Sequence, residues 1–127
     1  MHKSRLAGFI IDCKTADLEQ ASAFWSAALG YPLRPLSEES APEKYREMLT
    51  GKGGLHIEVQ KVDHPSRLHL DIETDDIEAE VQRLEALGAK RVEKGLRWWI
   101  MEAPTGQRFC VVRPQREDFA TSANAWK

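Results

Sequence analysis

The sequence predicts an α+β fold made of two tandem β-α-β-β-β modules in one domain of 127 residues. The first observation is an internal repeat. Residues 15–31 (TADLEQASAFWSAALGY) resemble residues 74–89 (TDDIEAEVQRLEALGA), and both helical patterns close on Leu-Gly. The second is an echo downstream of each repeat, because residues 54–61 align with residues 106–113. Repetition of one strand–helix–strand pattern in so short a chain indicates a duplicated module.

The first predicted module spans residues 6–62 and opens with a strand at 6–13, which is apolar nearly throughout and therefore covered on both faces. Asp17 caps the following helix, and Gly30 ends it. Residues 31–36 can form only an edge strand, because their two prolines cannot donate to a sheet. The remaining elements are a loop at 37–44, strands at 45–50 and 55–62, and a glycine-rich turn between them.

The second predicted module spans residues 66–113 and opens with a strand in which apolar and polar residues alternate from 68 to 73. Asp75 and Asp76 both offer a helix N-cap, and Asp75 has capping-box spacing to Glu78. An apolar helical stripe follows and stops before Gly88. The last predicted elements are strands at 90–93, 96–102 and 108–113, followed by a polar tail at 114–127 in which Phe119 and Trp126 are docking residues.

Composition narrows the function classes. The chain is 42% hydrophobic and 30% charged, as soluble globular proteins are, and its net charge of −2 with no basic stripe argues against nucleic acid. No apolar run approaches the roughly 20 residues that span a bilayer, and no signal peptide is visible, so we expect a cytoplasmic protein with no membrane partner. Cys13 and Cys110 lie in apolar strand contexts and are predicted to be reduced thiols.

Three motifs carry a family resemblance: AFW-x3-LGY on the first helix, HLDI-x-TDDIEAEVQRLEALGA opening the second module, and P-x-G-x-x-F-x-V-V at its end. Together they resemble the vicinal oxygen chelate superfamily of glyoxalases, bleomycin-resistance proteins and extradiol dioxygenases, and most closely its glyoxalase-like domain branch. The likeness covers residues 6 to 113. It implies that each module forms a half-barrel of a curved mixed sheet around a central pocket, where a divalent metal binds a substrate through two adjacent oxygens.

The resemblance also implies four metal-ligand positions. His69 matches the first-strand ligand of the second module, and Glu58 matches the last-strand ligand of the first module. Cys110 stands where the family commonly has Glu, and the fourth position falls at Ile10, or at Gly8 if the following loop carries an insertion. Neither Ile10 nor Gly8 can bind a metal. Glu58, His69 and Cys110 are a donor set that zinc accepts, yet the missing ligand favours a metal-free site over a divalent metal such as zinc.

Further side chains are candidates for chemistry. Glu58, His69 and His56 are the candidate catalytic residues, and His56 lies on the same strand face as Glu58. The alternative for His56 is a strand-end histidine bonded to a loop. Asp71 lies on the face of His69 and either orients that imidazole or pairs with a lysine or arginine. We therefore treat Asp71 and Cys110 as candidate substrate-binding residues.

Two tryptophans complete the predicted substrate-binding set. Trp98 and Trp99 point to opposite strand faces, so one belongs to the core and the other to the pocket or a dimer contact; Trp99 is assigned to the pocket. Trp25 is assigned to the pocket wall, with the helix–sheet core as its alternative.

Three functions remain open from the sequence. The first is a glyoxalase-like lyase, isomerase or dioxygenase that acts on a small oxygenated molecule. The second is a metal-free protein that binds or sequesters a small molecule, as bleomycin-resistance proteins do. The third is a structural partner domain, as the resemblance allows. A small-molecule ligand and a homodimer, paired through the apolar edge at residues 31–36, are the predicted partners.

Overall fold

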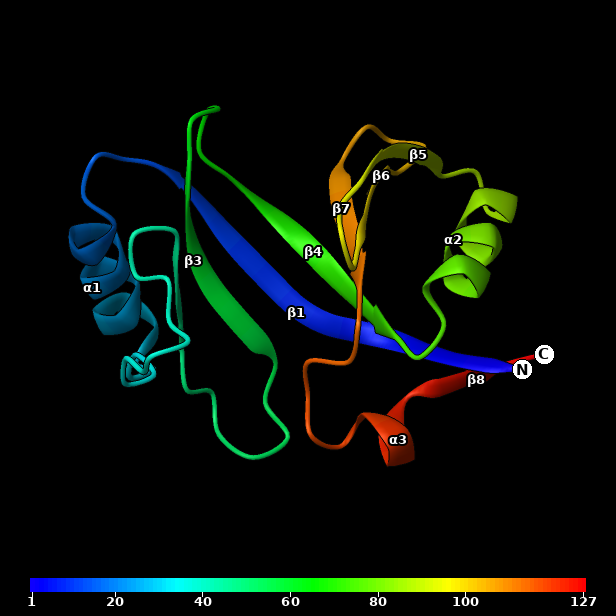
Figure 1. Cartoon of the computed structure of the whole chain (residues 1–127), viewed down its shortest axis with the longest axis horizontal. Coiled ribbons are helices and arrows are strands. Elements are labelled where there is room, and N and C mark those ends of the chain that lie inside the picture. Colours follow the sequence, from blue (N-terminus) through cyan, green and yellow to red (C-terminus); the bar gives the residue numbers. More distant parts are fainter. The chain divides into compact units, whose positions relative to one another are not determined.

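The computed structural model describes residues 1–127 and confirms an α+β fold with a mixed sheet. Eight strands belong to the sheet, and β4 pairs with β7 in parallel while the pairs β2–β3, β5–β6 and β6–β7 are antiparallel. The strands are β1 (His2–Lys14), β2 (Tyr45–Glu47), β3 (His56–Val62), β4 (Arg67–Thr74), β5 (Lys90–Lys94), β6 (Trp99–Glu102), β7 (Arg108–Val112) and β8 (Asn124–Trp126), and the helices are α1 (Leu18–Leu29), α2 (Ile77–Ala86) and α3 (Phe119–Ser122) (Figure 1).

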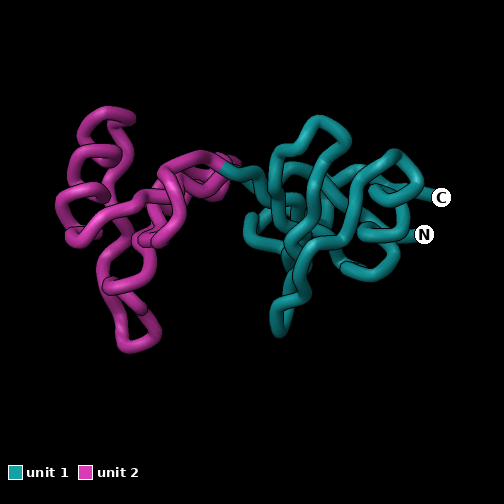
Figure 2. Tube along the Cα trace, turned by 90° about the horizontal axis from the view of Figure 1, so that it is seen from above, with its two compact units in different colours: residues 1–8, 69–127 teal, residues 9–68 magenta.

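The chain divides into two compact units, shown in two colours in Figure 2. Unit 2 comprises residues 9–68, and unit 1 comprises residues 1–8 together with 69–127. Strand β1 contributes to both units, so the first eight residues belong with the second half of the sequence. The module boundaries drawn from the repeat, 6–62 and 66–113, stay a prediction.

The helices are short. Helix α1 has 12 residues and α2 has 10, whereas a bilayer span takes roughly 20. None of the helices in the structure is both long enough and apolar enough to cross a membrane.

In unit 2, α1 packs against β3 and the C-terminal part of β1. Strands β2 and β3 pair with Arg46 opposite Val59 and Glu47 opposite Glu58. The core gathers aliphatic side chains from both strands and the helix: Ile11, Cys13, Leu18, Met48, Ile57 and Val59. Because Ile57 and Val59 face this core, the alternate residues of β3 face the other side of the sheet.

The ends of α1 are those that the sequence predicts. Asp17 is the N-cap in an extended conformation, and its side chain accepts a hydrogen bond from the backbone N–H of Gln20. Gly30 follows the helix with a φ of 78°, a left-handed conformation that a side chain would strain. The buried face of α1 is narrow, because Leu18 and Ser22 are its buried residues and Phe24 is exposed.

The edge strand predicted at 31–36 is wrong as a strand. It is reduced to a single antiparallel bridge between Leu33 and Met48. Arg34 still donates its N–H to the carbonyl of Glu47 over 2.8 Å, but the prolines on either side interrupt the ladder. The strand predicted at 45–50 is also shorter than expected, since β2 spans Tyr45–Glu47.

In unit 1, α2 covers one face of the strands β4, β7 and β6. Val81 and Leu84 of the helix pack against Met101 of β6 and Val111 of β7. Ile72 of β4 lies against the same core and is the register partner of Val111. The alternate residues of these strands therefore face away from α2: His69, Asp71, Glu73 and Cys110.

Helix α2 begins at Asp76. The Asp76 side chain accepts from the N–H of Ala79 over 3.0 Å, so the capping box predicted for Asp75 is not formed. Asp75 instead accepts a hydrogen bond from the backbone N–H of Lys3 over 2.8 Å. The two neighbouring aspartates therefore differ in role. Asp76 caps α2, and Asp75 binds the backbone of β1.

The tail predicted as polar at 114–127 is ordered as α3 and β8, which the sequence did not predict. Buried Glu73 fixes its start by accepting hydrogen bonds from the backbone N–H groups of Gln115 and Arg116 and from Nε of Arg5. Arg5 also contacts Asp118 over 2.7 Å. Phe119 is buried, which agrees with its expected docking role.

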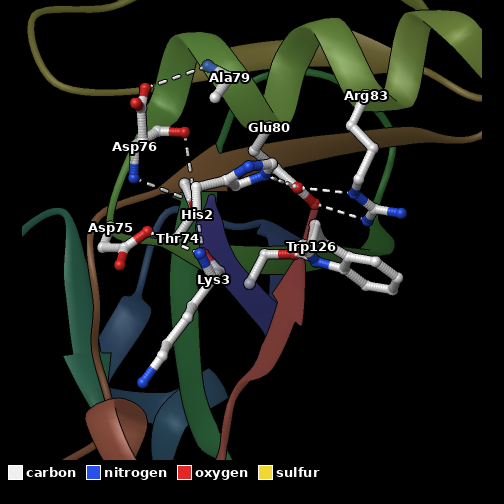
Figure 3. A network of polar contacts seen from close by, with 10 residues as sticks. His2, Lys3, Thr74, Asp75, Asp76, Ala79, Glu80, Arg83 and Trp126 are labelled. Atoms are coloured by element: carbon white, nitrogen blue, oxygen red, sulfur yellow. Dashed lines mark hydrogen bonds and ion pairs between the residues drawn. The ribbon is translucent and has the colours of Figure 1, made fainter.

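Strand β8 pairs antiparallel with the start of β1, with His2 opposite Trp126. Above this pair lies the carboxylate of Glu80, which is fully buried and contacts His2 at 2.8 Å (Figure 3). Arg83 donates two hydrogen bonds to the same carboxylate and stacks over the ring of Trp126. Both ends of the chain are thereby attached to α2.

Candidate functional site

One polar cluster lies in unit 1, on the sheet face opposite to α2. It consists of His69 and Asp71 on β4 and Cys110 on β7. One ligand atom from each residue, an imidazole nitrogen, a carboxylate oxygen and a thiol sulfur, lies within 4.8 Å of the other two. These are three of the residues that the sequence singled out.

Strand pairing explains how the three residues meet. Asp71 and Cys110 are register partners in the parallel pair β4–β7, and neighbouring strands lie about 4.8 Å apart. His69 lies two positions before Asp71, which returns its side chain to the same face. Leu70 and Phe109 form the preceding register pair; Phe109 packs against the core on the opposite face, whereas Leu70 is exposed.

The geometry within the cluster leaves an acceptor available. Nε2 of His69 lies 3.5 Å from Oδ1 of Asp71, which is an ion-pair distance longer than a well-formed hydrogen bond. That oxygen is buried and accepts no hydrogen bond. The structure thus places Asp71 beside His69, and a buried carboxylate oxygen without a donor costs about 1–3 kcal/mol.

A second polar cluster lies in unit 2, on the face of β3 opposite to its core. Nε2 of His56 lies 2.9 Å from Oε1 of Glu58, and Nδ1 lies 3.8 Å from a carboxylate oxygen of Glu47. The His56 side chain is buried, and Glu47 also contacts Arg34 over 3.0 Å. His56 therefore has carboxylates near both ring nitrogens, a setting that suits an imidazole that exchanges protons.

Sequence reasoning missed Glu47. It reaches His56 because β2 pairs with β3 so that Glu47 is opposite Glu58. The only signal in the sequence was a charged residue in a short strand. The strand register that brings this residue to His56 depends on residues about ten positions away. Asp71 was recognised as a residue that could orient His69 and as a candidate substrate-binding residue, but not as a metal ligand.

The predicted substrate-binding tryptophans lie on other faces within their units. Trp25 packs against the core of unit 2, on the side opposite to His56 and Glu58, and its ring meets Phe24 edge to face. Trp99 packs against the core of unit 1, with Arg91 above its ring, and its register partner is Val111 rather than Cys110. The structure therefore does not bring either ring to the polar cluster of its own unit.

The donor set of unit 1 fits a divalent metal. Imidazole, carboxylate and thiolate together suit zinc, and the acceptor oxygen of Asp71 that lacks a hydrogen bond is available as a ligand. Ile10 is a buried aliphatic residue with 3% exposure and supplies no donor. Glu58, the other predicted ligand, lies in unit 2 and contacts His56 there.

The two thiols lie in different environments, and both are free as predicted. Burial raises the pKa of the Cys13 thiol, a side-chain hydrogen bond with Trp25 acts in the opposite direction, and the charge of Asp12 adds to the increase. Cys110 is only partly buried. Of the two, Cys110 is the thiol available for chemistry.

Comparison with solved structures agrees with this fold. A hypothetical protein from Bacillus halodurans C-125 superposes with a TM-score of 0.61 at 15% identity, covering 90% of this chain and 96% of that one. A structure described as the NAD-dependent benzaldehyde dehydrogenase of Legionella pneumophila gives 0.57 at 9% identity, covering 84% and 99%. A glyoxalase/bleomycin resistance protein/dioxygenase superfamily member from Vibrio splendidus 12B01 gives 0.54 at 15% identity, covering 87% and 98%. Identities this low show a shared fold.

Comparison with protein families is more specific. No curated protein matches the sequence. Residues 8–112 match the family model of the glyoxalase-like domain, a range that contains both polar clusters. The chain therefore belongs to the glyoxalase-like domain family, within the vicinal oxygen chelate superfamily of glyoxalases, bleomycin-resistance proteins and dioxygenases.

Proposed function

We propose that this protein binds a small oxygenated molecule and acts on it by glyoxalase-like chemistry, as a lyase, isomerase or dioxygenase. The observation that supports this is the cluster of His69, Asp71 and Cys110 in a chain of the glyoxalase-like family. A divalent metal held there would act as a Lewis acid toward a carbonyl or enol oxygen of the ligand. The ligand class is then a compound with two oxygens on adjacent carbons.

His56 of unit 2 is the candidate proton-transfer group, and its support comes from contacts within its own unit. Its ring contacts Glu58 at 2.9 Å, and a carboxylate in that position orients an imidazole and stabilises its protonated form. Glu47, at 3.8 Å from the other ring nitrogen, adds a second negative charge. An imidazole between two carboxylates can take a proton from a carbon beside a carbonyl group and return it to a neighbouring atom.

The experiment is a binding screen by isothermal titration calorimetry, with and without added zinc. The panel pairs each vicinal compound, such as a 1,2-diketone, a 2-hydroxyketone or a catechol, with an analogue that lacks one of the two oxygens. We expect the vicinal member of at least one pair to bind at least tenfold more tightly, and His69→Ala to abolish that preference. Equal affinity within every pair would overturn the proposal.

A second candidate is metal-free binding of a small molecule, which the position of Ile10 favours. Where the superfamily resemblance implies a ligand on the first strand, this chain has a buried aliphatic side chain. Protein treated with a chelator would then keep its ligand affinity, and His69→Ala together with Glu58→Ala would leave binding within about threefold without any turnover. A loss of binding after chelation would exclude this candidate.

The predicted homodimer is part of the proposal. Leu36 on the apolar segment 31–36 is exposed, as is Phe24 on α1 in the same unit. Sedimentation velocity at several protein concentrations would give the mass of a dimer. Leu36→Ser would shift the population toward the monomer if this segment forms the interface.

A further inference from the structure

The cluster of unit 1 contains three different kinds of metal-binding atom. His69 offers an imidazole nitrogen, Asp71 a carboxylate oxygen and Cys110 a thiol sulfur, all within 4.8 Å of one another. All three come from two neighbouring strands of one unit, so their separations are fixed by backbone pairing between Asp71 and Cys110. A cation bound to these atoms would be held by a rigid part of the sheet.

Asp71 has a feature that a purely orienting residue would not need. Its Oδ1 atom is buried and accepts no hydrogen bond, and Nε2 of His69 lies 3.5 Å away. The whole residue is 8% exposed, so water satisfies little of the carboxylate. A buried charge of this kind is stable when it is paired or when it coordinates a metal.

We propose that unit 1 alone holds a zinc-class divalent cation, with His69, Cys110 and Asp71 as direct ligands. The proposal deepens the proposed function and rests on it for the ligand that completes the coordination. It differs from the pattern that the superfamily resemblance implies, in which ligands come from both modules and Asp71 is not among them. Glu58 is then free to act with His56 rather than on the metal.

The distances are compatible with a tetrahedral site. Zinc binds nitrogen and oxygen at about 2.0–2.2 Å and thiolate sulfur at about 2.3 Å, which places ligand atoms roughly 3.3–3.8 Å apart. The three atoms need at most about 1.5 Å of closure from 4.8 Å, which rotations of the side chains supply. Three protein ligands leave a fourth position for an oxygen of the bound molecule.

The thiol decides which cation the site prefers. Sulfur ligands select zinc and related metals over magnesium, calcium and manganese, which prefer sets of oxygen atoms. When the metal binds, the Cys110 thiol loses its proton to the solvent and the sulfur–metal bond replaces the sulfur–hydrogen bond. No oxidant or further reactant takes part in this step.

Cobalt(II) is the probe for the test, because a cobalt–thiolate bond absorbs in the near ultraviolet and the visible bands report the coordination geometry. The full-length protein is titrated with cobalt and then with zinc as a competitor. We expect one equivalent of cobalt, a thiolate band that Cys110→Ser abolishes, and displacement by zinc. Magnesium at the same concentration is expected to leave the spectrum unchanged.

The Asp71→Asn variant tests whether Asp71 binds the metal directly or only orients His69. Asn keeps the shape and can still contact His69, but it is a poor ligand, so we expect affinity to fall at least tenfold and the visible bands to change. Mutation of a residue that only orients a metal-binding histidine also lowers metal affinity by about 10–100-fold. The change in the visible bands is therefore the decisive readout. Asp63→Asn, at an exposed position in unit 2, is the matched control.

Two results would overturn the inference. One is a folded Asp71→Asn variant, checked by circular dichroism, with unaltered cobalt bands. The other is Glu58→Gln that weakens cobalt binding as much as His69→Ala does, because the metal would then be shared with unit 2. Cobalt binding as described, with no preference for vicinal compounds, would instead refute the proposed function and leave the metal site standing.

Discussion

Trp126 donates a hydrogen bond from its indole Nε1 to the hydroxyl oxygen of Ser4 over 2.7 Å, across 122 positions of sequence. The guanidinium carbon of Arg83 lies 3.9 Å from the centroid of the same ring, close enough for a cation–π contact. Ser4 is buried and pairs with Asn124 in the ladder between β1 and β8. The C-terminal strand is therefore an integral part of unit 1.

Removing residues 124–127 should lower the free energy of unfolding by about 2–3 kcal/mol, since it removes a hydrogen bond, the cation–π contact and part of a strand pair. Urea unfolding followed by circular dichroism measures the change. Trp126→Phe keeps the ring but loses the indole N–H and should cost about 1 kcal/mol. Leu96→Ala, at a residue that is 93% exposed, is the control. An unchanged midpoint after truncation would contradict the assignment.

Glu80→Gln should destabilise the protein by roughly 3 kcal/mol, because it leaves Arg83 and His2 without their shared carboxylate in a buried setting. The amide has nearly the same shape as the carboxylate, so the loss reports charge and hydrogen bonding rather than packing. Thermal unfolding of the variant beside the unchanged protein is sufficient. Glu93→Gln, on an exposed site of β5, should stay within about 0.5 kcal/mol.

Acid stability should depend on Glu80. Burial acts to raise the pKa of this carboxyl, but hydrogen bonds from Arg83, His2 and Ser4 and the charge of Arg83 outweigh it, so the net pKa lies below the ordinary value. The unfolded chain therefore takes up the proton first. This contribution is present above about pH 4.3, the ordinary glutamate value, and is lost as the pH falls through the lower folded pKa.

The measurement is the free energy of unfolding in urea from pH 7 down to pH 3. The unchanged protein should lose stability steeply in the acid range, whereas Glu80→Gln should show a shallower slope because that proton uptake is gone. Parallel curves for the two proteins would show that Glu80 does not contribute to the acid transition.

The two helix caps make a paired prediction. Asp17→Ala and Asp76→Ala each remove a side-chain acceptor for an N–H of the first turn and should each cost about 1 kcal/mol. Asp75→Ala removes the contact with Lys3 but leaves α2 capped. A larger loss of helical circular dichroism for Asp75→Ala than for Asp76→Ala would mean that α2 begins one residue earlier.

The thiols should react at different rates. Cys13 is buried and burial raises its pKa, so little thiolate forms near neutral pH and reagents reach it slowly. A disulfide reagent such as dithiobis-nitrobenzoate should label one thiol rapidly in the native protein and both in urea. Cys110→Ser should remove the rapid phase, and zinc should slow it in the unchanged protein. A rapid phase that survives in Cys110→Ser would place the reactive thiol at Cys13.

Much of the fold could be predicted from local signals. The repeat between residues 15–31 and 74–89 indicated two copies of a module, and Asp17 with Gly30 gave the limits of α1. Alternation along β4 predicted which of its side chains share a face, and so placed His69 and Asp71 together. These features depend on residues a few positions apart, whose steric and hydrogen-bonding preferences act within a single turn or strand.

The tertiary structure decided what depends on distant pairing. The parallel register of β4 with β7 sets Asp71 beside Cys110, and the register of β2 with β3 sets Glu47 beside His56. Pairing with β1 turned the end of a polar tail into β8. A one-residue shift in any of these ladders would send each side chain to the opposite face, and no short stretch of sequence fixes that choice, because it follows from how a whole core packs.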